Sequence, residues 1–194
     1  SAEHMLLPHF IRNKYSKLNQ RYITILNING KHSHRLAPLI DKLALPTLVI
    51  TDLDSAEPTG YHEKAEPVRN KGLISGNYAI TNWIIKKNLL DDLLDLSDDE
   101  KVVTKKSVCD YQIRVAYQIP IKVTHLGVEV EALARTFEDS LIYTNWDVLS
   151  SLKATDPGQL LKKLKDGFDA KKSFDSPKTT IFNELKKSEV KAEF

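Results

Sequence analysis

Apolar residues recur along the first fifty positions at spacings that predict alternating helices and strands. Apolar positions three and four residues apart predict helices over residues 2–17 and 33–43. The β-branched run over residues 22–28 and the apolar run that ends at Asp52 predict two buried strands. Helix, strand, helix and strand joined by short links are typical of a parallel α/β sheet flanked by helices.

The rest of the chain continues this pattern after a long polar interruption. Residues 55–77 are rich in Glu, Pro, Gly, Lys and Asn, and a loop of this length is often functional. The elements expected beyond it are strands over 108–116 and 119–123 and helices over 78–89, 129–147, 157–168 and 178–191. We therefore expect an α/β fold with an inserted helical and loop segment.

The strand that ends at Asp52 carries the most informative chemical pattern. One residue separates Asp52 from Asp54, and strand alternation points both carboxylates the same way. Two like charges that close together repel each other, and a divalent cation removes the repulsion. Oxygen ligands suit Mg²⁺ or Mn²⁺ better than zinc. A solvated turn is the alternative, but the preceding apolar strand and the long following loop favour a metal site.

Composition narrows the classes of function. The 194 residues are 41% hydrophobic and 28% charged, as in ordinary globular domains, and the net charge of +2 leaves room only for a local basic surface. The single cysteine, Cys109, excludes an intrachain disulfide and fits a reducing cytoplasm, where we expect the protein. No apolar run approaches membrane-spanning length, so we expect no membrane partner. Neither a nucleotide-binding glycine loop nor a GxSxG motif occurs.

Other residues are candidates for the same chemistry, each with a structural alternative. Glu3 could supply a third carboxylate, or could favour the N-terminus of its own helix. Glu138 lies beside an apolar helix stripe and could face a cleft, or could pair with Arg135 at i,i+3 spacing. His32 and His34 could contact a metal or a phosphate, although satisfied histidines near a helix N-cap are the favoured interpretation.

Five segments with these candidates occur in a recognisable order. They are AEHMLLP at 2–8, ING at 28–30 with the helix that follows, LVITDLDS at 48–55, RTFED at 135–139 and KAEF at 191–194. Together they resemble the Toprim catalytic domain of the overcoming-lysogenisation-defect (OLD) nucleases and of the related Gabija nuclease subunit. Each segment is modestly specific, but the ordered set frames nearly the whole chain.

The resemblance implies an endonuclease, a hydrolase that cuts or nicks DNA with two Mg²⁺ or Mn²⁺ ions in antiphage defence. It implies that Glu3, Asp52, Asp54 and Glu138 hold the metal, with Glu3 and Asp52 also catalytic. It implies that Lys191 offsets the charge that develops on the phosphate in the transition state.

The loop after the paired aspartates is a candidate DNA-binding segment. Ser55 could help to position the metal or the DNA strand. Arg69, Asn70 and Lys71 are candidate phosphate contacts, which fix position without reading the base sequence. A solvated loop is the alternative interpretation.

Departures from the family pattern shape the expected domain organisation. The leading Glu-Gly pair is missing and the last motif ends at Phe194. We therefore expect 1–194 to be one Toprim domain, a fragment of a longer ATP-dependent chain with an ATPase region upstream. The long separation of Asp54 from Glu138 implies an insertion over about 56–120. As partners, the resemblance implies DNA, further copies of the full-length protein and a helicase-like protein.

Two positions and the reaction itself keep alternatives. Asp139 is an alternative to Glu138. Lys171 also precedes a phenylalanine by three residues, so it is an alternative to Lys191. The other activities are those of Toprim primases, topoisomerases and RNA-maturation nucleases, or a non-catalytic nucleic-acid interaction module.

Overall fold

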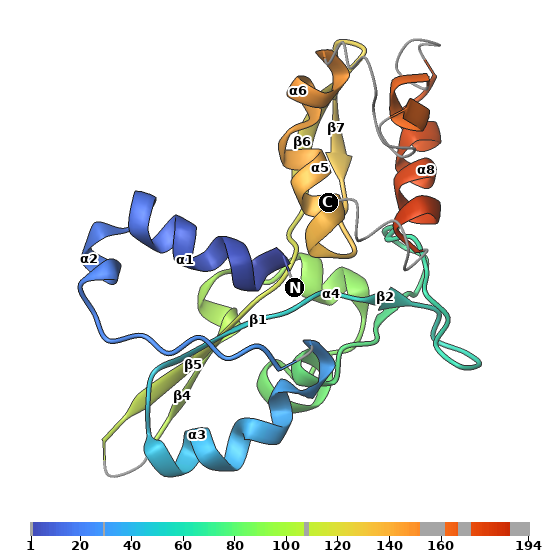
Figure 1. Ribbon diagram of the computed structural model, residues 1–194. Helices are drawn as coiled ribbons and strands as arrows, with labels where there is room; N and C mark the ends of the chain where they lie inside the picture. Colours follow the sequence, from blue (N-terminus) through green and yellow to red (C-terminus); the bar gives the residue numbers. More distant parts are fainter. Residues whose placement is uncertain (1, 29, 107–108, 152–161, 167–171, 187–194) are drawn as a thin grey trace.

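The N-terminal part of the chain consists mainly of helices. The structure is a computed structural model that describes residues 2–28, 30–106, 109–151, 162–166 and 172–186 (Figure 1). The elements before the first strand are α1 (Ala2–Lys14), α2 (Ser16–Asn19), the 3-10 helix η1 (Gly30–Leu36) and α3 (Ala37–Leu43). The two predicted helices are therefore present, the second as η1 followed directly by α3.

The predicted strand over residues 22–28 is wrong. This segment contains no strand, and Tyr22 and Leu26 are 100% and 60% exposed. A β-branched run forms a strand only where a neighbouring edge pairs with it and a core covers one face. Neither condition is visible in the sequence of the run itself.

The central sheet has three strands in the order β1-β5-β4. Strand β1 (Thr47–Ile50) pairs parallel to β5 (Tyr111–Ala116), and β4 (Val102–Lys105) pairs antiparallel to β5. The expected α/β fold with a parallel strand pair flanked by helices is confirmed, and the sheet as a whole is mixed. Because β1 and β5 are parallel, their carboxyl ends meet at the same edge.

The first hydrophobic core packs helices against this sheet. The helix predicted over 78–89 appears as the π-helix η2 (Ala79–Ile84), and α4 (Leu90–Leu94) follows it. The core residues are Val49, Ile113 and Val115 from the sheet, Ile80 and Ile84 from η2, Leu90 and Leu93 from α4, and Leu53. The paired aspartates thus flank Leu53, a residue fixed in the core.

A second hydrophobic core lies around a hairpin above the sheet (Figure 1). Its elements are β6 (Ile121–His125), β7 (Val128–Ala132), α5 (Phe137–Thr144), α6 (Trp146–Ser151) and α8 (Asp175–Leu185). Ile142, Trp146 and Ile181 from the three helices pack there with Val123 and Ala132 from the hairpin. Chain segments far apart in sequence therefore form one compact lobe.

The predicted helix over 129–147 is wrong in its first part, where the chain forms strand β7. Leu126 and Gly127 both have positive φ, 51° and 79°, as a two-residue type I′ hairpin turn requires. Residues 128–132 then alternate apolar and charged side chains with the period of a strand. The turn therefore determines the structure of this segment, and its signal was the Leu-Gly pair.

The remaining elements are short. Strands β2 (Ser55–Ala56) and β3 (Ile74–Ser75) form a small antiparallel ladder at the two ends of the predicted loop, and the 3-10 helix η3 (Asp99–Lys101) precedes β4. Residues 162–166 are helical, and the rest of the predicted helix over 157–168 lies outside the described residues. The same holds for positions beyond 186 of the helix predicted over 178–191.

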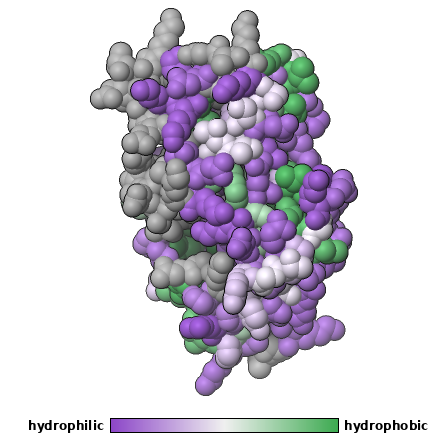
Figure 2. Space-filling view, turned by 90° about the vertical axis from the view of Figure 1, so that its right-hand side faces the viewer, coloured by the Kyte–Doolittle hydropathy of each residue, from purple (hydrophilic) through white to green (hydrophobic). Residues whose placement is uncertain are grey.

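The surface is largely polar. On the face in Figure 2, hydrophilic side chains predominate and hydrophobic ones form separate small patches. No helix in the described part of the chain is both long and apolar enough to cross a bilayer.

The packing of the first hydrophobic core predicts how substitutions there change the free energy of unfolding. Leu93→Ala should lower the free energy of unfolding by about 2–5 kcal/mol, because Leu93 is fully buried and its removal leaves a cavity. The matched control Leu39→Ala, at a side chain that is 49% exposed, should change it by less than about 1 kcal/mol. Urea denaturation followed by circular dichroism measures both, and equal effects would contradict this packing.

Candidate functional site

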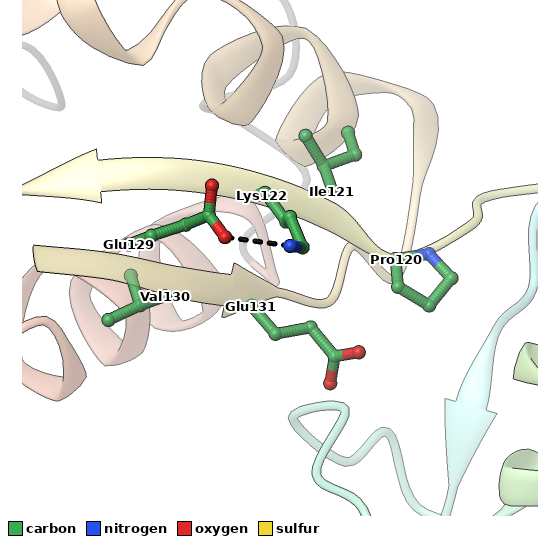
Figure 3. A pocket seen from close by; sticks show the side chains of 6 residues that line it. All are labelled: Pro120, Ile121, Lys122, Glu129, Val130 and Glu131. Carbon is green, nitrogen blue, oxygen red and sulfur yellow. Dashed lines mark hydrogen bonds and ion pairs between the residues drawn. The ribbon is translucent and has the colours of Figure 1, made fainter.

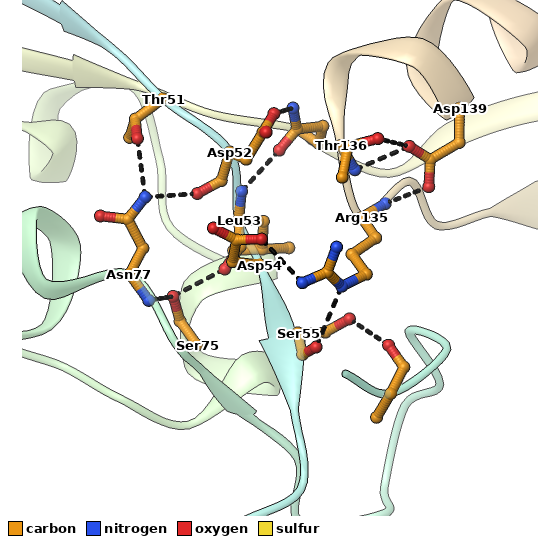
Figure 4. Close-up of polar contacts among 12 residues, drawn as sticks. Thr51, Asp52, Leu53, Asp54, Ser55, Ser75, Asn77, Arg135, Thr136 and Asp139 are labelled. Atoms are coloured by element: carbon orange, nitrogen blue, oxygen red, sulfur yellow. Dashed lines mark hydrogen bonds and ion pairs between the residues drawn. The ribbon is translucent and has the colours of Figure 1, made fainter. Parts of the chain in front are cut away.

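The candidate site is built around residues 52–54, which we call the acidic segment. This segment follows β1 and lies between residues 75–77 on one side and residues 135–136 on the other (Figure 4). Leu53 is fully buried in the first core, while Asp52 and Asp54 on either side of it are half-buried. The buried leucine therefore anchors both carboxylates.

Residues 75–77 bind the acidic segment through its three main-chain carbonyl oxygens. The bonds run from Asn77 Nδ2 to Asp52 O (2.8 Å), from Ser75 Oγ to Leu53 O (2.6 Å) and from the Gly76 amide to Asp54 O (2.8 Å). Asn77 is fully buried, and its Oδ1 accepts a bond from the Ala79 amide at the start of η2. Asn77 thus binds both the start of η2 and the acidic segment.

Gln118 binds the acidic segment from the neighbouring strand. Its Nε2 donates to Asp52 Oδ1 at 2.9 Å, and its Oε1 accepts from the Leu53 amide at 2.7 Å. The parallel register pairs Ile50 with Ala116, so two residues further on Gln118 lies opposite Asp52. Gln118 is not among the residues predicted for the site, and a polar residue two positions after a buried strand was the available signal.

The N-terminus of α5 contacts the acidic segment from the second lobe. The Phe137 amide donates to Asp52 Oδ1 at 3.0 Å, and the Asp54 amide donates to the Arg135 carbonyl at 3.2 Å. Main-chain amides at a helix N-terminus favour a negative charge. Glu138, which is half-buried, is the next residue of α5. The structure therefore brings the segment that contains Glu138 next to Asp52 and Asp54.

Arg135 forms a buried ion pair with Asp54. Its Nη2 lies 2.7 Å from Asp54 Oδ1, and the side chains are only 8% and 13% exposed. Its Nε also donates to the Ser55 carbonyl at 3.2 Å. The sequence analysis had offered Glu138 as its partner, but the structure pairs it with Asp54. A buried carboxylate needs such compensation, because an isolated charge at low dielectric is costly.

The expected strand alternation does not extend to Asp54. Strand β1 ends at Ile50, and Asp54 has a φ of 54°, which aspartate tolerates better than most residues. Both carboxylates bind residues 135–137, Asp52 through the Phe137 amide and Asp54 through the Arg135 guanidinium. Strand alternation therefore does not determine the direction of the Asp54 side chain.

Asp139 stabilises the N-terminus of α5. It forms a capping box with Thr136, and its Oδ2 accepts from the Arg135 amide at 2.7 Å. Asp139 is 5% exposed, and burial raises its pKa although the hydrogen bonds from Thr136 and Arg135 oppose the rise. Its carboxylate is occupied by main-chain donors, which favours Glu138 over Asp139 as the functional acid.

The donor chemistry of the acidic segment fits a hard divalent cation. Carboxylate oxygens are the ligands that Mg²⁺ and Mn²⁺ prefer. Among the described residues there is no group of three or more His, Cys, Asp or Glu side chains that could hold a metal. Glu3 lies in α1 with its side chain outside the described part, and Lys191 and Lys171 lie outside the described residues altogether.

The residues predicted to contact DNA occupy different environments. Ser55 is fully buried, and its hydroxyl donates to the Ala65 carbonyl at 2.6 Å. Arg69 binds Glu131 and Asp95, at 2.8 and 2.9 Å, and these bonds raise its pKa further above its ordinary value. Both contacts favour structural roles. Lys71 and Asn70 are exposed.

A separate pocket of about 370 Å³ lies along the β6–β7 hairpin (Figure 3). Lys122 and Glu129, which line it, pair with each other at 2.7 Å across the two strands. Glu131, also in its lining, is the partner of Arg69. Its charged side chains are thus engaged in ion pairs, and the acidic segment does not line it.

Comparison with known families supports the interpretation of the acidic segment. Residues 1–54 match the family described as "Overcoming lysogenization defect protein-like, TOPRIM domain". The resemblance to the OLD-type Toprim domain is confirmed. The matched region ends at Asp54, so both paired aspartates lie within this Toprim segment.

A curated relative matches over most of the chain. Endonuclease GajA of Bacillus cereus (strain HuB5-5) is 28% identical over 197 residues, covering 95% of this chain and 26% of GajA. The chain thus spans about a quarter of the length of that relative. No solved structure matches the chain.

The buried ion pair predicts a measurable contribution to stability. Arg135→Ala should lower the free energy of unfolding by about 3–5 kcal/mol, because it leaves the Asp54 carboxylate buried without its cation. Adding Asp54→Asn to that variant should restore part of the loss, since the uncompensated charge is then removed.

The control for this measurement is Arg114→Ala. Arg114 pairs with Asp98 at 3.0 Å, but both side chains are exposed, so the loss should stay within about 1 kcal/mol. Urea denaturation of the three variants decides the outcome. An Arg135→Ala protein as stable as the Arg114→Ala protein would contradict the buried pair.

Proposed function

We propose that this chain carries the nuclease site of a metal-dependent DNA endonuclease of the OLD Toprim type. One observation supports the proposal above all others. Asp52 and Asp54 follow a parallel strand and bind residues 135–137, so two acidic segments far apart in sequence meet at the carboxyl edge of the sheet. The family match over residues 1–54 and the name of the relative, an endonuclease, are consistent with it.

In this proposal the metal ligands are Asp52, Asp54, Glu138 and Glu3. Two Mg²⁺ or Mn²⁺ ions about 4 Å apart would supply an activated water and stabilisation of the leaving oxygen. Residues 75–77 donate hydrogen bonds to the main-chain carbonyls of the acidic segment, and Gln118 binds it as well. These bonds keep the segment in place before any cation binds. Such preorganisation lowers the reorganisation required at the moment of reaction.

Arg135 has a defined role in this proposal. Its guanidinium compensates the Asp54 charge when no cation is bound, and its second bond to the Ser55 carbonyl keeps it beside the carboxylate. A bound cation then shares or replaces this compensation. Lys191 is the proposed side chain that offsets charge on the phosphate.

The proposal also covers the substrate, the partners and the biological role of the whole protein. DNA is the proposed substrate, and an ATPase region elsewhere in the same chain, self-assembly and a helicase-like partner follow from the family resemblance. A role in antiphage defence within the cytoplasm, with ATP as a regulator, belongs to the same proposal.

The first test removes a proposed ligand and the proposed lysine. Asp52→Ala and Lys191→Ala should each slow Mg²⁺- or Mn²⁺-dependent plasmid cleavage by about 100-fold or more, because the first removes a metal ligand and the second removes a positive charge beside the phosphate. Gel analysis of plasmid nicking and linearisation measures the rate. Asp147→Ala and Lys17→Ala, at exposed positions, should cleave like the unchanged protein.

Thermal denaturation accompanies this test, so that a folding defect is recognised. Full cleavage by either correctly folded variant would refute its assigned role. If Lys191→Ala cleaves normally and Lys171→Ala does not, Lys171 is the functional lysine. Plasmid relaxation without strand cleavage would instead indicate the topoisomerase alternative.

The second test separates Glu138 from Asp139. Glu138→Gln should weaken Mn²⁺ binding and cleavage while leaving the free energy of unfolding within about 1 kcal/mol, because the side chain is half-buried and lies outside the capping box. Asp139→Asn should lower that free energy by about 1–3 kcal/mol. The side-chain NH₂ of the asparagine would face the main-chain N–H groups of Arg135 or Thr136, so a hydrogen bond would be lost. Calorimetric Mn²⁺ titration and urea denaturation give both readouts, and the reverse pattern would assign Asp139 as the ligand.

A further inference from the structure

The proposed function leaves one singled-out motif without a role, the pair of histidines in η1. This helix contains Lys31, His32, His34 and Arg35 and no acidic residue. It packs on η2, and the His34 ring lies against the Tyr78 ring with a centroid distance of 4.4 Å and an interplanar angle of 50°. The two rings form an aromatic pair next to a local concentration of basic residues.

This aromatic pair is linked directly to the acidic segment. Tyr78 follows Asn77, whose Nδ2 donates to the Asp52 carbonyl at 2.8 Å and to Thr51 Oγ1 at 2.6 Å. Asn77 is fully buried, so the main chain that carries Tyr78 is fixed relative to Asp52. The Tyr78 side chain is nevertheless 51% exposed. A large, half-exposed aromatic ring therefore follows directly on the residue that binds the main chain of Asp52.

Ser33, between the two histidines, gives an independent indication. It is 4% exposed, and its Oγ is the one buried side-chain oxygen or nitrogen in the described part of the chain that has no hydrogen-bond partner. A buried hydroxyl without a partner costs about 1–3 kcal/mol. An acceptor from outside the protein, such as a phosphate oxygen, would remove that cost after a small adjustment of η1.

A metal ion fits these residues less well. The His32 and His34 rings are 6.3 Å apart, and the described residues contain no set of three His, Cys, Asp or Glu side chains able to bind a metal. Protein zinc sites use three or four such ligands. Stacking on an aromatic ring beside basic side chains is instead typical of the binding of a single nucleic-acid strand.

We propose that His34 and Tyr78 form a stacking platform for one base of a single DNA strand next to the cleavage site. The Ser33 hydroxyl is the hydrogen-bond donor to the adjoining phosphate. This inference rests on the proposed nuclease function, whose site it supplies with a strand-binding surface. The platform is tolerant of base identity, because every base has a face that stacks.

Binding of a fluorescein-labelled single-stranded oligonucleotide tests the platform, with EDTA present to prevent cleavage. Tyr78→Ala should weaken binding by roughly 5- to 150-fold, the range for one stacked base. Tyr78→Phe keeps the ring and should bind within about 3-fold of the unchanged protein. His34→Ala should also weaken binding, and Ser33→Ala should weaken it without loss of stability.

Tyr61→Ala is the matched control, because Tyr61 is fully exposed and lies in the loop after β2. It should bind like the unchanged protein, and thermal denaturation should show that every variant is folded. Equal binding by the Tyr78→Ala and Tyr61→Ala proteins would overturn the platform. So would equal weakening by Tyr78→Phe and Tyr78→Ala.

Plasmid cleavage with Mg²⁺, measured on the same preparations, separates this inference from the proposed function. Cleavage by the unchanged protein together with strand binding that does not depend on Tyr78 rejects the platform and leaves the nuclease proposal intact. Tyr78-dependent binding by a protein that cleaves nothing supports the platform and rejects the nuclease proposal.

Discussion

The buried ion pair between Arg135 and Asp54 is the constraint on which the candidate site depends. It joins two segments 81 residues apart, and both side chains are almost completely removed from solvent. Buried charges attract each other more strongly than charges in water, and burying either one alone would cost a large desolvation free energy. The pair therefore fixes the acidic segment against the N-terminus of α5. It also links the part of the chain around the first hydrophobic core to the part around the second.

Around this pair the protein satisfies the main chain of the acidic segment from both sides. Residues 75–77 donate hydrogen bonds to its carbonyl oxygens, while the Gln118 side chain and the Arg135 carbonyl accept hydrogen bonds from its amides. Almost no main-chain group is left to permit an alternative conformation, so the two carboxylates keep their positions without a ligand. A rigid acidic segment of this kind is suited to holding cations with little rearrangement.

Local patterns predicted the parts of the fold that depend on nearby residues. Strand β1 and helix α3 were predicted correctly because hydrophobic periodicity is a short-range signal. The segment over 22–28 and strand β7 were not, because pairing and turn geometry decided them. Gln118 and Arg135 could not be assigned to the site from sequence, since their roles arise only once β5 and α5 reach the acidic segment. Asp139 was distinguished from Glu138 only by its burial and its bonds to main-chain amides.

The central claim is that Asp52 and Asp54 form a preorganised cation site. Crystals of the protein soaked in Mn²⁺, with anomalous scattering measured near the manganese absorption edge, test it most directly. The account predicts anomalous density within about 2.0–2.3 Å of carboxylate oxygens of Asp52 and Asp54, with the contact between Arg135 and Asp54 lengthened or shared. Fully occupied Mn²⁺ elsewhere, with the contact between Asp54 and Arg135 unchanged, would contradict it.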